Sequence, residues 1–324
     1  MPRFNIRHVT RYNYEEPVRD SANQVILFPI NDEYQETIKQ DLAITSDPLV
    51  EMYKDYYGNS IGSFTYAEPH KQLVIDSKIE VLVKEKPMPA DADPKEKQWQ
   101  RLNDIKYTYP YIDFIKQEVF NATAEVRELP VIATASSYTP LKSALQLTAY
   151  IFENFTYDKA VTDVETTIDE VWKLKAGVCQ DFAHALLVML RMIGIPARYV
   201  SGYVCPNKSG LRGEGATHAW VEAYIPFYGW LGLDPTNNCI VKDLHVRLAT
   251  GRSFSDVSPV KGTYKGTSRH TLEVGVTVSY EDGSKSEEQP AKLVEQPNKN
   301  GTIPSYNSYR RNLEIIQQQQ QQQQ

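Results

Sequence analysis

Hydrophobic and polar residues alternate with a period of two through the first part of the chain, which is the pattern of half-buried β-strands. Within Lys71–Glu85, for example, Val81 and Val83 fall on one face and polar residues on the other. Short strands of this kind, separated by turn residues, predict a β-sandwich or barrel-like domain over residues 1–86. The expected strands are Arg3–Tyr14, Asn23–Pro29, Ile38–Thr45, Leu49–Tyr56, Ser60–Ala67 and Lys71–Glu85.

The pattern then changes to helical spacing. Proline and acidic residues dominate 87–94, which predicts a linker. Thr167 and Glu170 have the spacing of a helix capping box. The strongest helical signal is 179–193, where apolar residues form one stripe and Gly194 supplies a C-terminal stop. Other helices are expected at Ser143–Phe155 and Thr167–Lys175, and strands at Ala197–Tyr203, Thr217–Ile225, Trp230–Leu233 and Leu272–Tyr280.

These patterns divide the chain into four parts. The N-terminal β-rich domain spans 1–86, and the linker 87–94 joins it to a core at 95–282. Residues 283–324 are polar and end in a glutamine homopolymer, so we expect a disordered tail without a catalytic role.

Composition excludes several classes of protein. The chain has 324 residues and a net charge of -6, and no Lys/Arg run indicates a nucleic-acid partner. No apolar run approaches the roughly 18 residues of a membrane span, and the polar N-terminus lacks the apolar core of a secretory signal. Three scattered cysteines are too few for a disulfide framework. We therefore expect a cytoplasmic protein.

The first candidate for chemistry is Cys179, which follows Gly177-Val178 at the start of the strongest predicted helix. The free N–H groups and the positive end of the helix dipole stabilise an anion there. A thiolate is such an anion, so this position favours a nucleophilic cysteine. Taken alone, the residue could equally be a small buried thiol.

The second candidate is His218, which begins a predicted strand. The period of two places His218, Trp220 and Glu222 on one face and alternate small or apolar residues on the other. A central strand is a rigid platform for a general base. A structural histidine is the simpler interpretation of this residue by itself.

The third candidate is Asp234, which ends the apolar strand Trp230–Leu233 and is followed by Pro235. A carboxylate there could accept the second N–H of a histidine and fix its tautomer. By itself it could also be an ordinary aspartate in a turn at a strand end.

Together the three residues compose a Cys-His-Asp triad, if the two strands form an antiparallel hairpin. Symmetric pairing around the loop 226–229 leaves Asp234 about three residues, or ~10 Å, from His218. A bulge, a strong twist or an asymmetric loop must close this gap. Gly229 and Gly232 are the candidates for that irregularity.

Three segments closely resemble the core of the transglutaminase-like superfamily, in the order in which that family has them: GVCQDFAHALLVMLRMIGIPARYVSGY, THAWVEAYIP and GWLGLDPTN. The start of the chain, RHVTRYNYEEPVRDSANQVILFP, resembles the β-rich N-terminal region of a bacterial branch described as putative cysteine proteases. The resemblance implies an α+β, papain-like fold with an N-terminal β-sandwich or barrel-like domain. It also implies Cys179 as nucleophile, His218 as base and Asp234 as orienting acid.

No cofactor or metal is expected. Animal members of this superfamily use calcium, but the chain has no calcium loop of the D-x-D-x-D-G type. Zinc bound by Cys179, His184, Cys205 and His218 has no supporting spacing. Cys205 and Cys239 are expected to be inert thiols.

Several neighbouring residues have a second interpretation. Tyr157 is either a packed tyrosine or a second oxyanion donor, the role that an upstream aromatic residue can have in the family. Asp181 most simply complements the helix dipole, and it could alternatively hold the neighbouring loop or substrate. His184 is expected to be structural. The loop Asn207–Gly215 is either a flexible connection or a rim of the cleft, with Arg212 or Glu214 at the substrate.

These features predict a thiol hydrolase of peptide, isopeptide or related amide bonds, acting on a peptide, a protein or a small amide through a thioester. The first alternative is a protein-glutamine transamidase, because the triad does not specify the second nucleophile. The other alternative is a non-catalytic interaction module with a vestigial triad. Neither the substrate nor the oligomeric state follows from the sequence.

Overall fold

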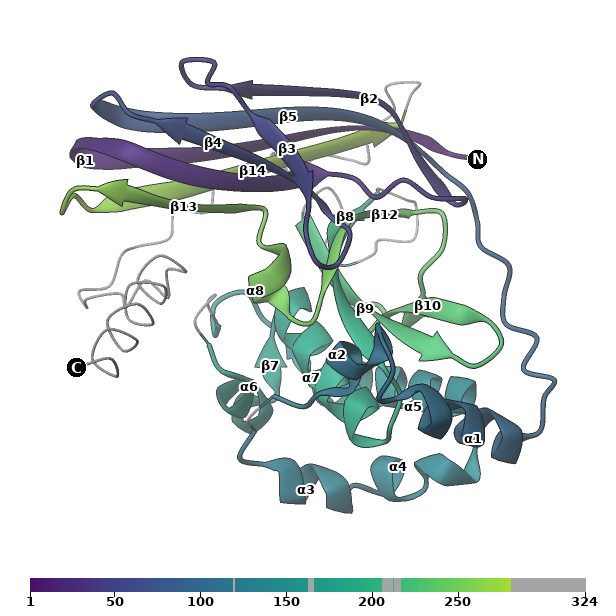
Figure 1. The fold of residues 1–324 in the computed structure, drawn as a ribbon. Coiled ribbons are helices and arrows are strands. Elements are labelled where there is room, and N and C mark those ends of the chain that lie inside the picture. The colour runs from purple at the N-terminus through teal and green to yellow at the C-terminus, as the bar shows by residue number, and fades with distance from the viewer. Residues whose placement is uncertain (119, 163–165, 206–211, 213–216, 281–324) are drawn as a thin grey trace, which may run out of the picture.

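The computed structural model describes residues 1–118, 120–162, 166–205, 212 and 217–280. Two sheets lie one above the other, and the helices cover the far side of the lower sheet (Figure 1). The predicted tail at 283–324 and most of the loop Asn207–Gly215 lie outside the described residues.

The upper sheet has seven strands. Its order is β2-β5-β1-β4-β3, and two strands from the end of the described chain also pair with β1. The strands are β1 (Arg3–Phe28), β2 (Gln35–Ile44), β3 (Glu51–Lys54), β4 (Ser60–Tyr66), β5 (His70–Val83), β13 (Val260–Lys265) and β14 (His270–Tyr280).

The long strand β1 merges the two runs predicted at Arg3–Tyr14 and Asn23–Pro29. Its first half lies between β5 and β14, and its second half lies between β4 and β13. The strand predicted at Leu272–Tyr280, within the core at 95–282, is β14, and it pairs with β1 from Phe4 opposite Tyr280 to Tyr14 opposite His270. The upper sheet is therefore built from both ends of the described chain.

The lower sheet has five antiparallel strands in the order β11-β10-β9-β8-β12. β6 and β7 form a separate short parallel pair. These strands are β6 (Thr156–Tyr157), β7 (Ala176–Gly177), β8 (Ala197–Val204), β9 (Thr217–Ile225), β10 (Gly229–Asp234), β11 (Cys239–Ile240) and β12 (His245–Gly251).

The helices follow the sequence signals closely. Thr139 caps α5, and Thr167 forms the predicted capping box with Glu170 at the start of α6. The helices are α1 (Lys95–Ile105), α2 (Tyr111–Ile115), α3 (Thr123–Glu128), α4 (Pro130–Ala133), α5 (Pro140–Asn154), α6 (Ile168–Leu174), α7 (Cys179–Met192) and α8 (Phe254–Val257), with a 3₁₀ turn at Ala135–Ser137.

The core of the helical layer forms where α7 packs against one face of β9. Leu186 and Met189 of α7 are fully buried there, together with the small or apolar residues on alternate positions of β9, such as Val221 and Ala223. A second core lies between the sheets, where Tyr203 of β8 and Val246 of β12 join apolar residues of the upper sheet. The lower sheet thus has an apolar face toward α7 and a partly polar face toward the upper sheet.

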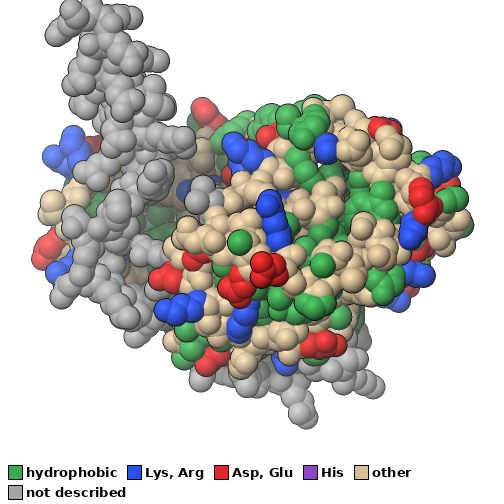
Figure 2. All heavy atoms as spheres, turned by 90° about the horizontal axis from the view of Figure 1, so that it is seen from below, with side chains coloured by type: hydrophobic (Ala, Val, Ile, Leu, Met, Phe, Trp, Pro, Cys, Tyr) green, Lys and Arg blue, Asp and Glu red, His purple; other side chains and the backbone are tan. Residues whose placement is uncertain are grey.

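The outer side of the helical layer is seen in Figure 2, where acidic and basic side chains are interspersed with apolar ones. Among the described residues, no helix is long and apolar enough to span a membrane.

Candidate functional site

Cys179 is the first residue of α7, as the sequence predicted. Asp181 fixes the backbone that leads into Cys179. Its carboxylate accepts hydrogen bonds from the backbone N–H of Val178 and the hydroxyl of Thr162, both at 2.7 Å. A side chain at Gly177 would overlap that carboxylate, so the glycine is required for this close approach. Asp181 therefore complements the helix N-terminus and also holds the neighbouring loop.

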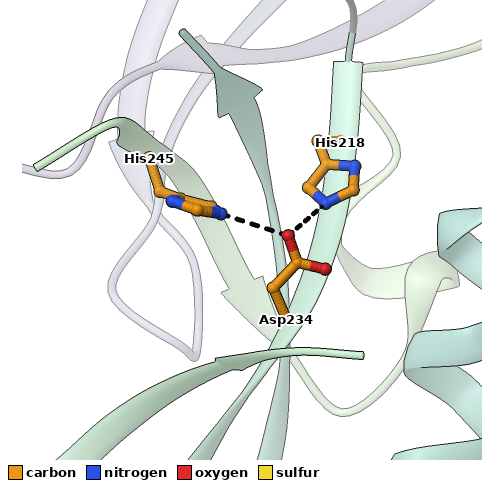
Figure 3. A group of neighbouring side chains, drawn as sticks. All are labelled: His218, Asp234 and His245. Atoms are coloured by element: carbon orange, nitrogen blue, oxygen red, sulfur yellow. Dashed lines mark hydrogen bonds and ion pairs between the residues drawn. The ribbon is translucent and has the colours of Figure 1, made fainter. Parts of the chain in front are cut away.

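His218 and Asp234 are in direct contact. Nε2 of His218 donates to Oδ2 of Asp234 at 2.8 Å, and both side chains are fully buried. Figure 3 shows the imidazole and the carboxylate facing one another from the start of β9 and the end of β10. A buried contact of this kind fixes the tautomer and the orientation of the imidazole.

The loop between β9 and β10 closes the gap that symmetric pairing would leave. Ile225 pairs with Gly229, and the ladder continues without a bulge to Val221 opposite Leu233. The loop contains three residues, 226–228, instead of the four of the symmetric pairing, and φ is positive at Phe227 and at Gly229. The register is thus shifted by one residue from symmetric pairing around 226–229. Because side chains alternate between the two faces of a strand, this shift places Asp234 on the same face of the sheet as Trp220 and His218. His218 is then the diagonal neighbour of Asp234 and within reach of its side chain.

The Asp234 carboxylate is surrounded by N–H donors. Oδ1 accepts from the backbone of Thr236 and of Asn237, and Oδ2 also accepts from the Asn237 side chain at 2.7 Å. Burial alone would raise the pKa of Asp234, but the neighbouring His218 and then His245 hold it well below its usual range. Asp234 is therefore ionised at neutral pH.

The Cys179 sulfur also acts on the imidazole of His218. Burial alone would lower the pKa of His218, but the Asp234 carboxylate and then the Cys179 sulfur more than offset it and raise it to about 10. Nδ1 of His218 is buried without a hydrogen bond of ordinary geometry among the described residues. The sulfur is thus close enough to act on the imidazole electrostatically, while Nε2 is engaged by Asp234.

A second histidine, His245 at the start of β12, also reaches Asp234. Its Nε2 lies 3.2 Å from the Oδ2 atom that His218 contacts (Figure 3). This residue was not predicted from the sequence. The signal was available, because His245 begins an alternating apolar strand in the same way as His218 does.

The three Asp234-centred side chains also have the composition of a metal site. Ligand atoms of His218, Asp234 and His245 lie within 4.8 Å of one another. Both ring nitrogens, however, already point at one carboxylate oxygen, so the three groups satisfy each other. This set differs from the zinc ligands considered from the sequence, because His184 and Cys205 lie elsewhere.

The remaining candidates are placed as follows. His184 points away from the site and accepts a hydrogen bond from the backbone N–H of Phe254 at 3.3 Å. Burial, then the nearby Cys179, raises the pKa of Tyr157 to about 12. The Arg212 guanidinium lies 5.7 Å from the Tyr157 ring, and its backbone N–H donates to the Asn237 side chain. Glu214 lies outside the described residues.

Comparisons with known proteins agree with this architecture. Residues 128–235 match the model of the transglutaminase-like superfamily, and residues 4–82 match the bacterial transglutaminase-like N-terminal region. A Mycobacterium bovis protein described as uncharacterized is 31% identical over 298 residues, covering 85% of this chain and 92% of its own. The chain belongs to the transglutaminase-like superfamily.

Its fold is also that of a solved structure. A protein from Cytophaga hutchinsonii named as a putative cysteine protease superposes with a TM-score of 0.65 at 19% identity, covering 91% of this chain and 96% of that one. The expected α+β, papain-like fold with a β-rich N-terminal region is confirmed. A Pseudomonas aeruginosa protein-glutamine gamma-glutamyltransferase is 37% identical over 87 residues, covering 25% of this chain and 13% of that protein.

Proposed function

We propose that the protein is a thiol-dependent acyl-transfer enzyme, with Cys179 as nucleophile, His218 as general acid and base, and Asp234 as the residue that orients His218. The observation that carries the proposal is the buried 2.8 Å contact between His218 and Asp234, beside a cysteine at a helix N-terminus. Membership of a superfamily that includes acyl-transfer enzymes supports it further.

In the proposed reaction, the Cys179 thiolate attacks the carbonyl carbon of an amide. The tetrahedral intermediate collapses when protonated His218 gives its Nδ1 proton to the leaving amine, and a thioester remains. A second nucleophile then attacks the thioester as neutral His218 takes its proton, and the thiolate leaves. The Nε2–H of His218 keeps its hydrogen bond to Asp234 throughout the reaction.

The oxyanion of the intermediate needs N–H or O–H donors. The backbone N–H of Cys179 lies in the first turn of α7, where no residue four positions earlier in the helix accepts it. Tyr157 is our candidate for a second donor, because burial and the nearby Cys179 keep its hydroxyl protonated. Removing one such donor typically costs about 10²–10³ in rate.

Hydrolysis of a peptide, isopeptide or related amide is the activity that we favour, with water as the second nucleophile. Transamidation between glutamine and an amine is the second candidate, and the match to a protein-glutamine gamma-glutamyltransferase supports it. The two reactions share the thioester and differ only in the group that resolves it.

An ammonia-release assay on a glutamine-containing peptide, with and without a primary amine, separates the two candidates. Transamidation predicts a product in which the added amine is linked to the glutamine side chain. Hydrolysis predicts glutamate, in the same yield with and without the amine. A panel of peptide and isopeptide substrates covers hydrolysis that releases no ammonia. Cys179→Ala must abolish each activity, and Cys239→Ala is the matched control. Full activity in Cys179→Ala would refute both candidates.

A further inference from the structure

His245 contacts Asp234 but has no role in the proposed triad. It is buried in β12, and its Nε2 shares one oxygen of Asp234 with His218. β12 and β10 are separated by two strands in the order of the lower sheet. In a flat sheet, strands so spaced lie about 14 Å apart. The sheet must therefore curl strongly for His245 to meet Asp234, so their contact is a specific feature of this fold.

The His245 ring is held in a defined orientation. It packs edge to face on Trp220, with ring centroids 5.2 Å apart, and Trp220 in turn stacks on His218 at 6.2 Å. Nδ1 of His245 is buried without a hydrogen-bond partner among the described residues. The proton of a neutral ring therefore belongs on Nε2, where it is donated to Asp234.

Two cavities adjoin His245. One cavity of about 540 Å³ lies along β11, and one of about 340 Å³ lies between the two sheets. His245 lines both cavities, whereas neither Asp234 nor His218 lines either of them. The Asp234 side chain is 0% exposed. The His245 ring is thus part of the wall that keeps water from the carboxylate.

We propose that His245 is a positioning residue, which holds the Asp234 carboxylate against His218 by a hydrogen bond and shields that contact from water. For its effect on catalysis this inference rests on the proposed function. The effect on His218 itself does not depend on any activity.

The physical consequence concerns the charge on His218. A carboxylate stabilises an imidazolium much more strongly in a water-free site than in a hydrated one. The other groups that act on His218 are Asp234 and Cys179, and those that act on His245 are Asp234, His218 and Asp243. Without His245, water reaches Asp234 from the cavities, and His218 loses part of its raised pKa.

The test is a titration of the His218 ring by NMR in the full chain. In His245→Ala we expect the titration midpoint of His218 to fall by at least one pH unit, a tenfold loss of proton affinity. His245→Gln retains an N–H donor and most of the volume, so its midpoint should fall by less than half as much. His8→Ala is the matched control, because His8 is equally buried but lies in the upper sheet.

Three results would overturn the inference: an unchanged His218 midpoint in His245→Ala, an equal fall in the alanine and glutamine variants, or an equal fall in His8→Ala. If His245→Ala does not fold, His245→Met fills the site without an N–H donor and takes its place. Alkylation of Cys179 and amide turnover are measured on the same variants. A wild type with a raised His218 midpoint but no activity contradicts only the proposed function, whereas an active His245→Ala with an unchanged midpoint contradicts only this inference.

Discussion

Asp234 lies diagonally across the hairpin from His218. Its Oδ2 atom accepts a hydrogen bond from Nε2 of the imidazole, with 2.8 Å between the two atoms. The backbone N–H groups of Thr236 and Asn237 fix the other oxygen. The carboxylate therefore has one orientation, and the imidazole that faces it has one tautomer.

Replacing this carboxylate by an amide tests its electrostatic role. In Asp234→Asn the charge that raises the pKa of His218 is lost, so we expect that pKa to fall from about 10 toward the ordinary 6.5. An analogous change in Ser-His-Asp triads lowers kcat by about 10⁴, and here we expect a loss of at least about 10²-fold. NMR titration of His218 and amide turnover are the measurements. Unchanged turnover would exclude Asp234 from the proposed mechanism.

The three cysteines should differ sharply in reactivity. Burial raises the pKa of Cys239 to about 12 and that of Cys205 well above its usual value, so both stay protonated at pH 7. We expect iodoacetamide to alkylate Cys179 first, at least tenfold faster than either. Peptide mapping after brief labelling identifies the site, and Cys179→Ala should lose the fast phase. A non-catalytic interaction module predicts no fast thiol.

Acid should destabilise the protein partly through His8. This histidine is buried and contacts the Tyr203 hydroxyl, and burial lowers its pKa to about 4. Between pH 6.5 and 4 the unfolded chain binds a proton at His8 that the folded chain excludes. The free energy of unfolding therefore decreases as the pH falls, by up to about 3 kcal/mol from this group.

The matched variant is His8→Gln, which cannot titrate. Its melting temperature should fall less between pH 7 and pH 4.5 than that of the wild type, whatever its stability at pH 7. Equal falls in the two proteins would show that His8 binds its proton at the same pH in the folded and the unfolded chain.

Gly202 should tolerate no side chain. A Cβ at this position would overlap the backbone carbonyl of Val246 and the Trp220 ring, which packs against both His218 and His245. Overpacking of this kind typically costs about 1–3 kcal/mol. We expect Gly202→Ala to lower the melting temperature and the amide turnover together. Retention of both would mean that β8 and β12 can separate without disturbing the site.

Sequence patterns predicted the elements that local chemistry determines. The start of α7 at Cys179, the capping box of Thr167 and the two faces of β9 each follow from residues close together in the chain. Such signals need no knowledge of the strand partners. For the same reason Cys179, His218 and Asp234 could be proposed as a group before their contacts were known.

Pairing between distant segments was beyond the sequence. The side to which Asp234 faces depends on the backbone of Phe227 and Gly229, and a shift of one residue reverses it. His245 was missed because it meets Asp234 only through the curl of the lower sheet. The alternation in β14 predicted a strand but did not identify β1 as its neighbour.

The pairing of β1 with β14 sets an order of events during synthesis. β1 begins at Arg3, but one of its edges stays open until residues 270–280 have left the ribosome. An open edge of this length is a template for pairing with another chain. The nascent protein therefore has to keep its first strand from other polypeptides while nearly all of the described chain is translated, and its upper sheet can be completed only afterwards.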